Sequence, residues 1–198
     1  MSRHLIGRAL VAAALVLQPG VPYADGAPTG PGEEEPAPLR TRYLLVGPDG
    51  GAVTDEDFRG RFQLITFGYT FCPDICPTTL LDMAEVLRIL GDAPLQAIFI
   101  TVDPQRDTRD VLGNYTRYFD PRILGLGGSP ELVARAAANF KVRYARVDEN
   151  DAGKGYYSVD HSAGLYLLGK DGEFLRKFGY GTPAARIADE ILSFIADE

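Results

Sequence analysis

Cysteine and the other side chains that bind soft metals are scarce in this sequence. Its 198 residues include two cysteines, Cys72 and Cys76, together with two histidines and two methionines. A domain of about 160 residues buries roughly 70% of its unfolded surface and needs no disulfide bond for stability. We therefore interpret the cysteine pair as functional. A small structural disulfide is the less favoured alternative, because so short a closed loop contributes little stability.

Basic tracts and long apolar runs are also missing. The net charge is −7, and no cluster of lysine or arginine offsets it, which argues against nucleic acid and anionic lipid as partners. The apolar run from Ala9 to Leu17 is well short of the roughly 20 residues that span a bilayer. Membrane attachment is therefore expected only through an N-terminal leader that is not cleaved.

Residues 1–24 have the layout of a secretory signal peptide. Arg3 and Arg8 give a basic start, the apolar run follows, and Pro19 ends it. We expect cleavage near Ala24, with a retained short membrane leader as the alternative, and a leader without cysteine excludes a lipoprotein anchor. Cleavage removes two arginines and no acidic residue, so the net charge moves from −7 to −9. The protein is expected to be exported, to the periplasm or the outer face of the inner membrane.

Two segments follow this leader. Residues 25–38 contain four prolines, three glycines and three consecutive glutamates, a composition that buries little and predicts a disordered tether. Residues 39–198 alternate between strand-like and helix-like patterns, which predicts one α/β domain with a central mixed sheet flanked by helices. The expected strands are 43–46, 62–69, 95–102, 123–126, 142–147, 164–168 and 174–178, and the expected helices are 78–90, 108–119, 131–140 and 184–196.

Turn residues and prolines refine this prediction. The turn at residues 48–51 predicts an N-terminal β-hairpin, and the turn at residues 170–172 predicts a hairpin that adds antiparallel strands to the sheet. Three helices follow a proline, namely Pro77, Pro130 and Pro183. We expect each proline at the first helical position, where the missing N–H has no intrahelical partner.

The two cysteines lie where the strand of residues 62–69 leads into a helix. Three residues separate them, and in a helical turn residues i and i+4 share a face, so the sulfur atoms can converge. Pro77 places Cys76 at or beside the helix N-terminus, where N–H groups with partial positive charge favour thiolate over thiol. Thiolates attack disulfides and bind soft metals, so the position and spacing fit either redox exchange or metal binding.

His161 is the candidate third metal ligand. Met83 lies about 10 Å along the helix from Cys76, and its spacing indicates a core position. His161 precedes the strand of residues 164–168, and loops at one edge of an α/β sheet converge. Two thiolates with one imidazole suit copper, whereas structural zinc usually has four ligands. Asp160 is a candidate to orient the imidazole, with a cap or turn role as the alternative.

Three motifs of this chain resemble those of the Sco/SenC copper proteins. They occupy residues 67–80 (FGYT, then CPDICPTTL from Cys72), residues 102–108 (VDPQRDT) and residues 159–162 (VDHS). The motifs occur in the family's order, each beside an expected strand, and the resemblance covers most of residues 43 to 180. One departure is Phe71, where many members have histidine.

The resemblance implies a thioredoxin-like fold in which Cys72, Cys76 and His161 bind one copper ion, as Cu(I) or Cu(II). It also implies a metallochaperone that delivers copper to the binuclear copper centre of cytochrome c oxidase, or that reduces the cysteines of that centre before metal loading. The implied partners are the copper-centre subunit of the oxidase and periplasmic donors of copper or thiols.

The main alternative is an enzyme, a metal-independent thiol–disulfide oxidoreductase of the periplasm with Cys72 and Cys76 as its redox-active pair. The usual thioredoxin-like motif has two residues between its cysteines, whereas this one has three. His161 discriminates between the hypotheses, because a pure oxidoreductase tolerates its replacement. A thiol peroxidase is a weaker third hypothesis, since no set of residues that activates peroxide is evident. Asp103, Arg106 and Asp107 form a further motif, in which Asp103 is interpreted as part of a turn and Asp107 as part of a helix cap.

Overall fold

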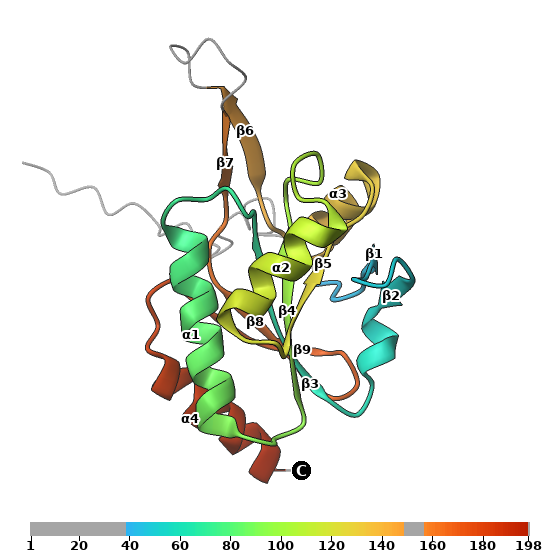
Figure 1. The fold of residues 1–198 in the computed structure, drawn as a ribbon. Coiled ribbons are helices and arrows are strands. Elements are labelled where there is room, and N and C mark those ends of the chain that lie inside the picture. The colour runs from blue at the N-terminus through green and yellow to red at the C-terminus, as the bar shows by residue number, and fades with distance from the viewer. Residues whose placement is uncertain (1–38, 149–156, 198) are drawn as a thin grey trace, which may run out of the picture. The chain divides into compact units, whose positions relative to one another are not determined.

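A mixed five-stranded sheet organises the chain (Figure 1). The computed structural model describes residues 39–148 and 157–197, so the expected signal peptide and tether lie outside the described residues and stay predictions. The strands are β1 (Leu44–Val46), β2 (Ala52–Thr54), β3 (Phe62–Gly68), β4 (Leu95–Thr101), β5 (Ile123–Leu126), β6 (Tyr144–Asp148), β7 (Tyr157–His161), β8 (Leu165–Leu168) and β9 (Phe174–Phe178). The helices are α1 (Ile75–Leu90), α2 (Arg109–Phe119), α3 (Pro130–Asn139), α4 (Ala184–Ala196) and the 3₁₀ turn η1 (Asp55–Phe58).

The central sheet has the strand order β5-β4-β3-β8-β9. Strands β3, β4 and β5 are parallel, whereas β8 pairs antiparallel with β3 and β9 antiparallel with β8. All seven residues of β3 are buried, as expected of a central strand whose two faces are both covered. The carboxyl ends of β3 and β4 therefore meet at one edge of the sheet.

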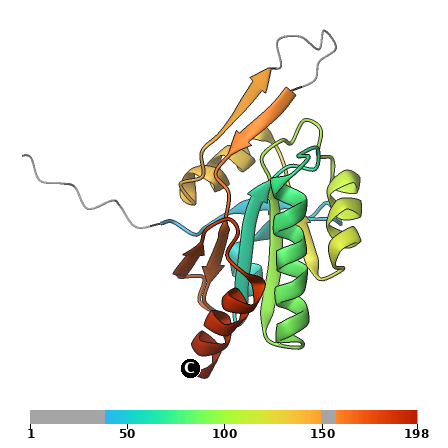
Figure 2. The same cartoon turned by 90° about the vertical axis from the view of Figure 1, so that its left-hand side faces the viewer.

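Helices and loops cover both faces of this sheet. Neighbouring residues of a strand point to opposite faces. On one face, Phe99 of β4 contacts Tyr115 of α2, with ring centroids 5.8 Å apart, and α1 packs against α4, the green and red helices that lie side by side in Figure 2. On the other face, Phe67 of β3 contacts Phe140, which follows the last residue of α3, at 5.3 Å.

Two short hairpins lie outside the central sheet. Strands β1 and β2 pair as the expected N-terminal hairpin, and an isolated bridge joins Val46 to Gly127 just after β5. Strands β6 and β7 form a second two-stranded sheet, which extends away from the central sheet in both ribbon views (Figures 1 and 2). The last residue of β7 is His161, so this hairpin carries the candidate histidine.

The fold class is as predicted, and the differences are local. No strand was predicted from Tyr157 to His161, but these residues form β7, because they pair with β6 along its whole length. Helix α1 begins at Ile75 instead of residue 78, so Pro77 is its third residue. Pro183 is the N-cap of α4, and only Pro130 has the first helical position expected for all three prolines.

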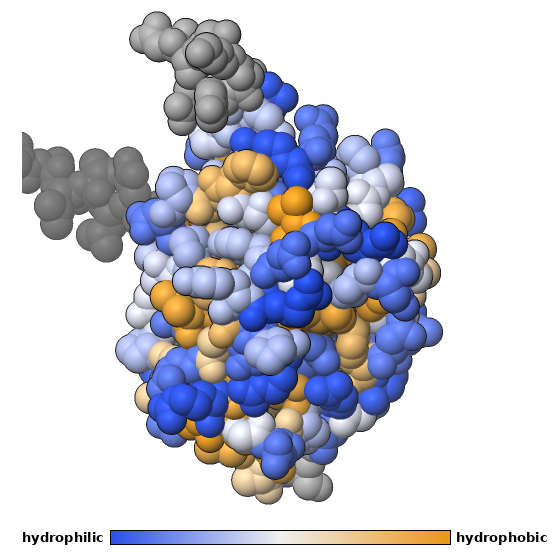
Figure 3. Space-filling view, in the orientation of Figure 1, coloured by the Kyte–Doolittle hydropathy of each residue, from blue (hydrophilic) through white to orange (hydrophobic). Residues whose placement is uncertain are grey.

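The face of the domain drawn in Figure 3 carries many hydrophilic residues. On the face drawn in Figure 3, hydrophobic residues form small groups among polar ones. Among the described residues, none of the helices combines the length and hydropathy that a bilayer-spanning segment needs.

Candidate metal centre

The candidate ligands lie at the edge of the sheet where the parallel strands β3 and β4 end. The loop after β3 carries Cys72 and leads into α1, whose second residue is Cys76. His161 ends β7, four residues before β8 begins. Because β8 pairs antiparallel with β3, the start of β8 meets the end of β3, and this topology brings His161 to the cysteines.

A glycine at the end of β3 makes room for the Cys76 sulfur. Cys76 is only 3% exposed and packs against the sheet. A Cβ atom at Gly68 would lie 2.6 Å from Cys76 Sγ and 2.8 Å from the ring of Phe99, closer than atoms in real structures approach. The absence of a side chain at Gly68 therefore fixes how deeply the sulfur sits.

His161 presents one ring nitrogen to this sulfur. Its Nδ1 donates a hydrogen bond to the Val159 carbonyl oxygen at 3.0 Å. Because a carbonyl oxygen can only accept, the proton is on Nδ1 and the lone pair is on Nε2. Nε2 lies 3.5 Å from Cys76 Sγ, and the Tyr69 ring meets the imidazole edge-to-face at 5.7 Å. The imidazole is thus held in the tautomer that binds a metal through Nε2.

The same geometry corrects the role expected of Asp160. The sequence made its carboxylate the candidate to orient His161, but the Nδ1 proton goes to the backbone of Val159. Asp160 is exposed. A carbonyl two residues away on the same strand orients the ring, because the ring folds back along the end of β7.

The Cys76 thiol does not have the acidity that its helix position predicted. Burial raises the pKa of Cys76, and a hydrogen bond with the Tyr69 backbone lowers it only in part. The nearby Cys72 and Asp107 raise it further. Burial therefore favours the neutral thiol of Cys76 over the thiolate in the metal-free protein.

The three predicted ligands are linked in pairs through Cys76. Cys72 and Cys76 are both free thiols, Cys72 lies close enough to raise the pKa of Cys76, and Cys76 Sγ lies 3.5 Å from His161 Nε2. The described residues contain no group of three or more His, Cys, Asp or Glu side chains that already surrounds one point. The donor chemistry suits a soft metal ion, and Cys72 is the more accessible of the two thiols.

Asp107 is a supporting residue that the sequence left unassigned beyond a helix cap. Thr108, not Asp107, is the N-cap of α2. The buried Asp107 carboxylate accepts hydrogen bonds from the Thr70 backbone N–H at 3.0 Å, from the Thr70 hydroxyl at 2.6 Å and from the Thr101 hydroxyl at 2.6 Å. It thereby ties the cysteine loop to the end of β4. Its place after β4, the strand beside the one that leads to Cys72, within a charged motif between strand and helix, is the signal that could have revealed it.

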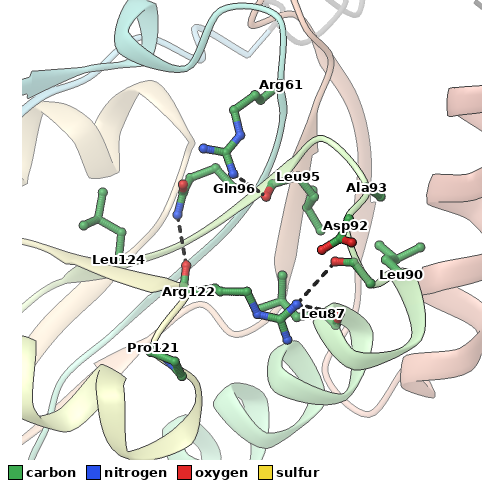
Figure 4. Close-up of a pocket in the computed structure, with 11 residues that line it drawn as sticks. Arg61, Leu87, Leu90, Asp92, Ala93, Leu95, Gln96, Pro121, Arg122 and Leu124 are labelled. Carbon is green, nitrogen blue, oxygen red and sulfur yellow. Dashed lines mark hydrogen bonds between the residues drawn. The ribbon is translucent and has the colours of Figure 1, made fainter.

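A larger pocket lies away from this centre. It has a volume of about 440 Å³ and lies by the amino ends of β3 and β4 (Figure 4). Arg122 Nη1 donates to the carbonyls of Leu87 and Gly91, and Arg61 donates to the carbonyl of Leu95. These donors cap the end of α1 and join loops, so we interpret the pocket as structural.

The fold and the site together define a thioredoxin-like α/β domain with two thiols and an imidazole at one sheet edge. A family model described as SCO1/SenC matches residues 31–196. The chain belongs to this family.

Individual relatives agree with this membership. The human protein named "Protein SCO2 homolog, mitochondrial" is 41% identical over 158 residues, which is 78% of this chain and 59% of the relative. A solved structure of Bradyrhizobium japonicum ScoI, described as having copper bound, is 40% identical with a TM-score of 0.70 over 77% of this chain and 96% of that one. The chain spans less than two thirds of the length of the human relative.

A more distant solved structure shares the fold. It is BsSco, described as a member of the Sco family of cytochrome c oxidase assembly proteins with a disulfide switch. It is 24% identical with a TM-score of 0.59, over 80% of this chain and 95% of that one.

Proposed function

We propose that this protein is a copper metallochaperone that binds one copper ion through Cys72, Cys76 and His161. The observation that carries the proposal is the 3.5 Å contact between Cys76 Sγ and His161 Nε2, in which the Nδ1 hydrogen bond keeps the Nε2 lone pair available. Two sulfurs and one imidazole form a soft, low-coordinate set of the kind that Cu(I) prefers. The ScoI structure with copper bound supports copper as the ion.

We further propose that the recipient is the binuclear copper centre of cytochrome c oxidase. The description of the Sco family as cytochrome c oxidase assembly proteins supports this recipient. Copper is the cargo. The reduced thiols take it up, and the protein passes it to the ligands of the recipient copper centre. Export to the periplasm or the outer face of the inner membrane follows from the layout of residues 1–24.

Thiol exchange is the second candidate function. Cys72 and Cys76 are free thiols near each other, so the pair can reduce a recipient disulfide to two thiols while it forms its own disulfide. This two-electron exchange needs no metal ion and no imidazole ligand, whereas a copper site uses His161 as a ligand. The contact between His161 and Cys76 is why we favour copper transfer as the primary function.

A paired transfer experiment tests the proposal. The full chain, reduced and loaded with one equivalent of Cu(I), is mixed with the copper-free, reduced copper-centre domain of the oxidase, and the copper content of both is measured after separation. We expect stoichiometric binding before mixing and transfer after it, with binding weakened in His161→Ala and in Cys72→Ser.

The second arm uses the copper-free, reduced chain and the oxidised copper-centre domain. Thiol exchange at full rate in this arm, together with copper binding that is the same with and without His161, would overturn the proposal in favour of an oxidoreductase. Ser129→Ala serves as a matched control for a folded variant, because it removes the hydroxyl that caps α3 and touches none of the three ligands.

A further inference from the structure

A buried ion pair lies beside the candidate metal centre, in the loop between β4 and α2. The Asp103 side chain is 4% exposed, and Arg106 Nε donates to its carboxylate. The Tyr157 hydroxyl donates to the same carboxylate at 2.8 Å. Asp103 and Arg106 belong to the loop, whereas Tyr157 is the first residue of β7, so the cluster joins two separate parts of the chain.

Arg106 contacts both segments that carry the candidate ligands. On the side of the hairpin, its Nη1 donates to the Tyr157 carbonyl at 3.0 Å, and its guanidinium lies 3.6 Å from the centre of the Tyr157 ring. On the side of the cysteine loop, the guanidinium lies 4.8 Å from the Phe71 ring and 5.6 Å from the Tyr69 ring. Phe71 is adjacent to Cys72, and the Tyr69 ring is the one that contacts His161.

The hairpin of β6 and β7 needs such an attachment. It forms a two-stranded sheet of its own, and within residues 39–148 and 157–197 no ladder of hydrogen bonds joins it to the central sheet. An isolated two-stranded hairpin is at best marginally stable in water. Val159 is its buried hydrophobic residue. The position of His161 therefore depends on what holds β7 against the rest of the domain.

We propose that Arg106 is the positioning residue that fixes the histidine-bearing hairpin against the cysteine loop. This inference rests on the proposed function, because it assigns Arg106 a role in the same copper site. Arg106 touches none of the three ligands and acts through Tyr157 on one side and through Phe71 and Tyr69 on the other. The planar guanidinium is suited to this role, because it donates in its plane and stacks on rings with its faces.

Arg106 also gives Phe71 a role. Phe71 is 58% exposed. In this chain it covers the guanidinium and shields the ion pair with Asp103 from water. Screening by solvent weakens exposed ion pairs, so this cover strengthens the attachment.

A double-mutant cycle tests the positioning role. Cu(I) affinity of the full chain is measured by competition with a chromophoric Cu(I) chelator for the parent, Arg106→Ala, His161→Ala and the double variant. Removal of residues that orient metal ligands typically lowers affinity 10- to 100-fold. We expect a loss of about tenfold or more for Arg106→Ala alone, and no further loss when it is added to His161→Ala, because Arg106 acts through the histidine.

A copper-free measurement accompanies the cycle. Backbone hydrogen exchange of the reduced chain is expected to accelerate in β6 and β7 on Arg106→Ala, with β3 and β4 unchanged. Arg109→Ala is the matched control, since Arg109 is a half-exposed arginine three residues along, paired only loosely with Asp110 at 3.9 Å. The control is expected to leave both the hairpin exchange and the copper affinity unchanged.

The outcomes separate this inference from the proposed function. If Arg106→Ala keeps the Cu(I) affinity and the hairpin hydrogen exchange of the parent, the positioning role alone is overturned. The same holds if Arg106→Ala lowers the Cu(I) affinity equally in the presence and in the absence of His161. Insensitivity of the parent affinity to His161→Ala would overturn the proposed function instead. If Arg106→Ala does not fold, Arg106→Lys replaces it. Lysine keeps the charge beside Asp103 but cannot donate in one plane to Asp103 and Tyr157, and unchanged affinity and exchange in this variant would also overturn the inference.

Discussion

At the scale of single residues, the two cysteines differ in how far solvent and reagents reach their sulfurs. Cys76 is 3% exposed, whereas Cys72 is half-buried in the loop. Burial also raises the pKa of Cys76, and a neutral thiol is a poor nucleophile. Cys72, the more exposed member of the pair, is thus the thiol that a reagent reaches more readily.

Alkylation order tests this difference. We expect iodoacetamide at pH 7.5 to modify Cys72 well before Cys76 in the reduced, copper-free chain, because the thiolate is the reacting form and Cys76 is both buried and protonated. Peptide mass spectrometry over a time course measures the two rates. Faster modification of Cys76 would contradict the burial that the structure assigns to it.

The buried carboxylate of Asp107 makes a pH prediction. Burial raises the pKa of Asp107, and hydrogen bonds from Thr101 and Thr70 offset this only in part. The folded state therefore binds this proton more tightly than the unfolded state, whose Asp pKa is about 3.9. The contribution of Asp107 to stability is largest below that unfolded pKa. It declines as the pH rises through the raised folded pKa, and then stays constant.

Comparison with Asp107→Asn isolates this contribution, because asparagine does not titrate. We expect the free energy of unfolding of the parent, relative to Asp107→Asn, to fall between about pH 4 and the raised pKa. Urea unfolding at a series of pH values measures it. A relative stability that instead increases over this range would show that the hydrogen bonds outweigh burial.

The residue scale also shows what sequence could and could not indicate. Cys72, Cys76 and His161 were found because thiols and imidazoles are rare in this chain and lie at strand ends. The roles of Val159 and Asp107 were not found. A backbone carbonyl leaves no mark in the sequence, and an aspartate before a helix has a simpler explanation as a cap.

At the scale of elements, the last residue of β3 leaves the space that the Cys76 sulfur occupies. Gly68 lies where a Cβ atom would meet both Cys76 Sγ and the Phe99 ring. Phe99 is 1% exposed, so neither neighbour has space to give way. The strand therefore requires glycine at this position for reasons of packing.

Gly68→Ala is expected to lower the free energy of unfolding by about 1–3 kcal/mol, the usual cost of overpacking a core. Thermal and denaturant unfolding measure this loss. Gly179→Ala is the control, because no heavy atom lies within 4 Å of a Cβ there and its backbone is not left-handed. Equal stability of the two variants would show that the end of β3 is looser than described.

Elements with a strong apolar pattern were predictable, and those stabilised by pairing were not. The strands at residues 62–69 and 95–102 and the helix at 184–196 matched closely, since buried strands and amphipathic helices carry their period in the sequence. Strand β7 was missed because most of its residues are not fully buried. Its conformation depends on pairing with β6, which no local pattern of β7 records.

At the scale of the whole molecule, the topology of the sheet determines which edge of the domain carries the candidate metal ligands. Parallel strands β3 and β4 end at the edge where β8 begins, and this arrangement gathers Cys72, Cys76 and His161. The large pocket lies by the amino ends of β3 and β4, and backbone carbonyls of α1 and β4 accept hydrogen bonds from its arginines. We therefore place metal transfer at the edge where β3 and β4 end, and we assign no small-molecule substrate to the pocket.

The measurement that tests the account most directly is copper K-edge X-ray absorption of the full chain loaded with one equivalent of Cu(I), beside His161→Ala. We predict two sulfur scatterers and one imidazole nitrogen around copper in the parent. In His161→Ala the imidazole contribution is lost and both sulfurs are retained. A copper environment that is the same in the two proteins, or that lacks one of the two sulfurs in the parent, would contradict the proposed three-ligand site.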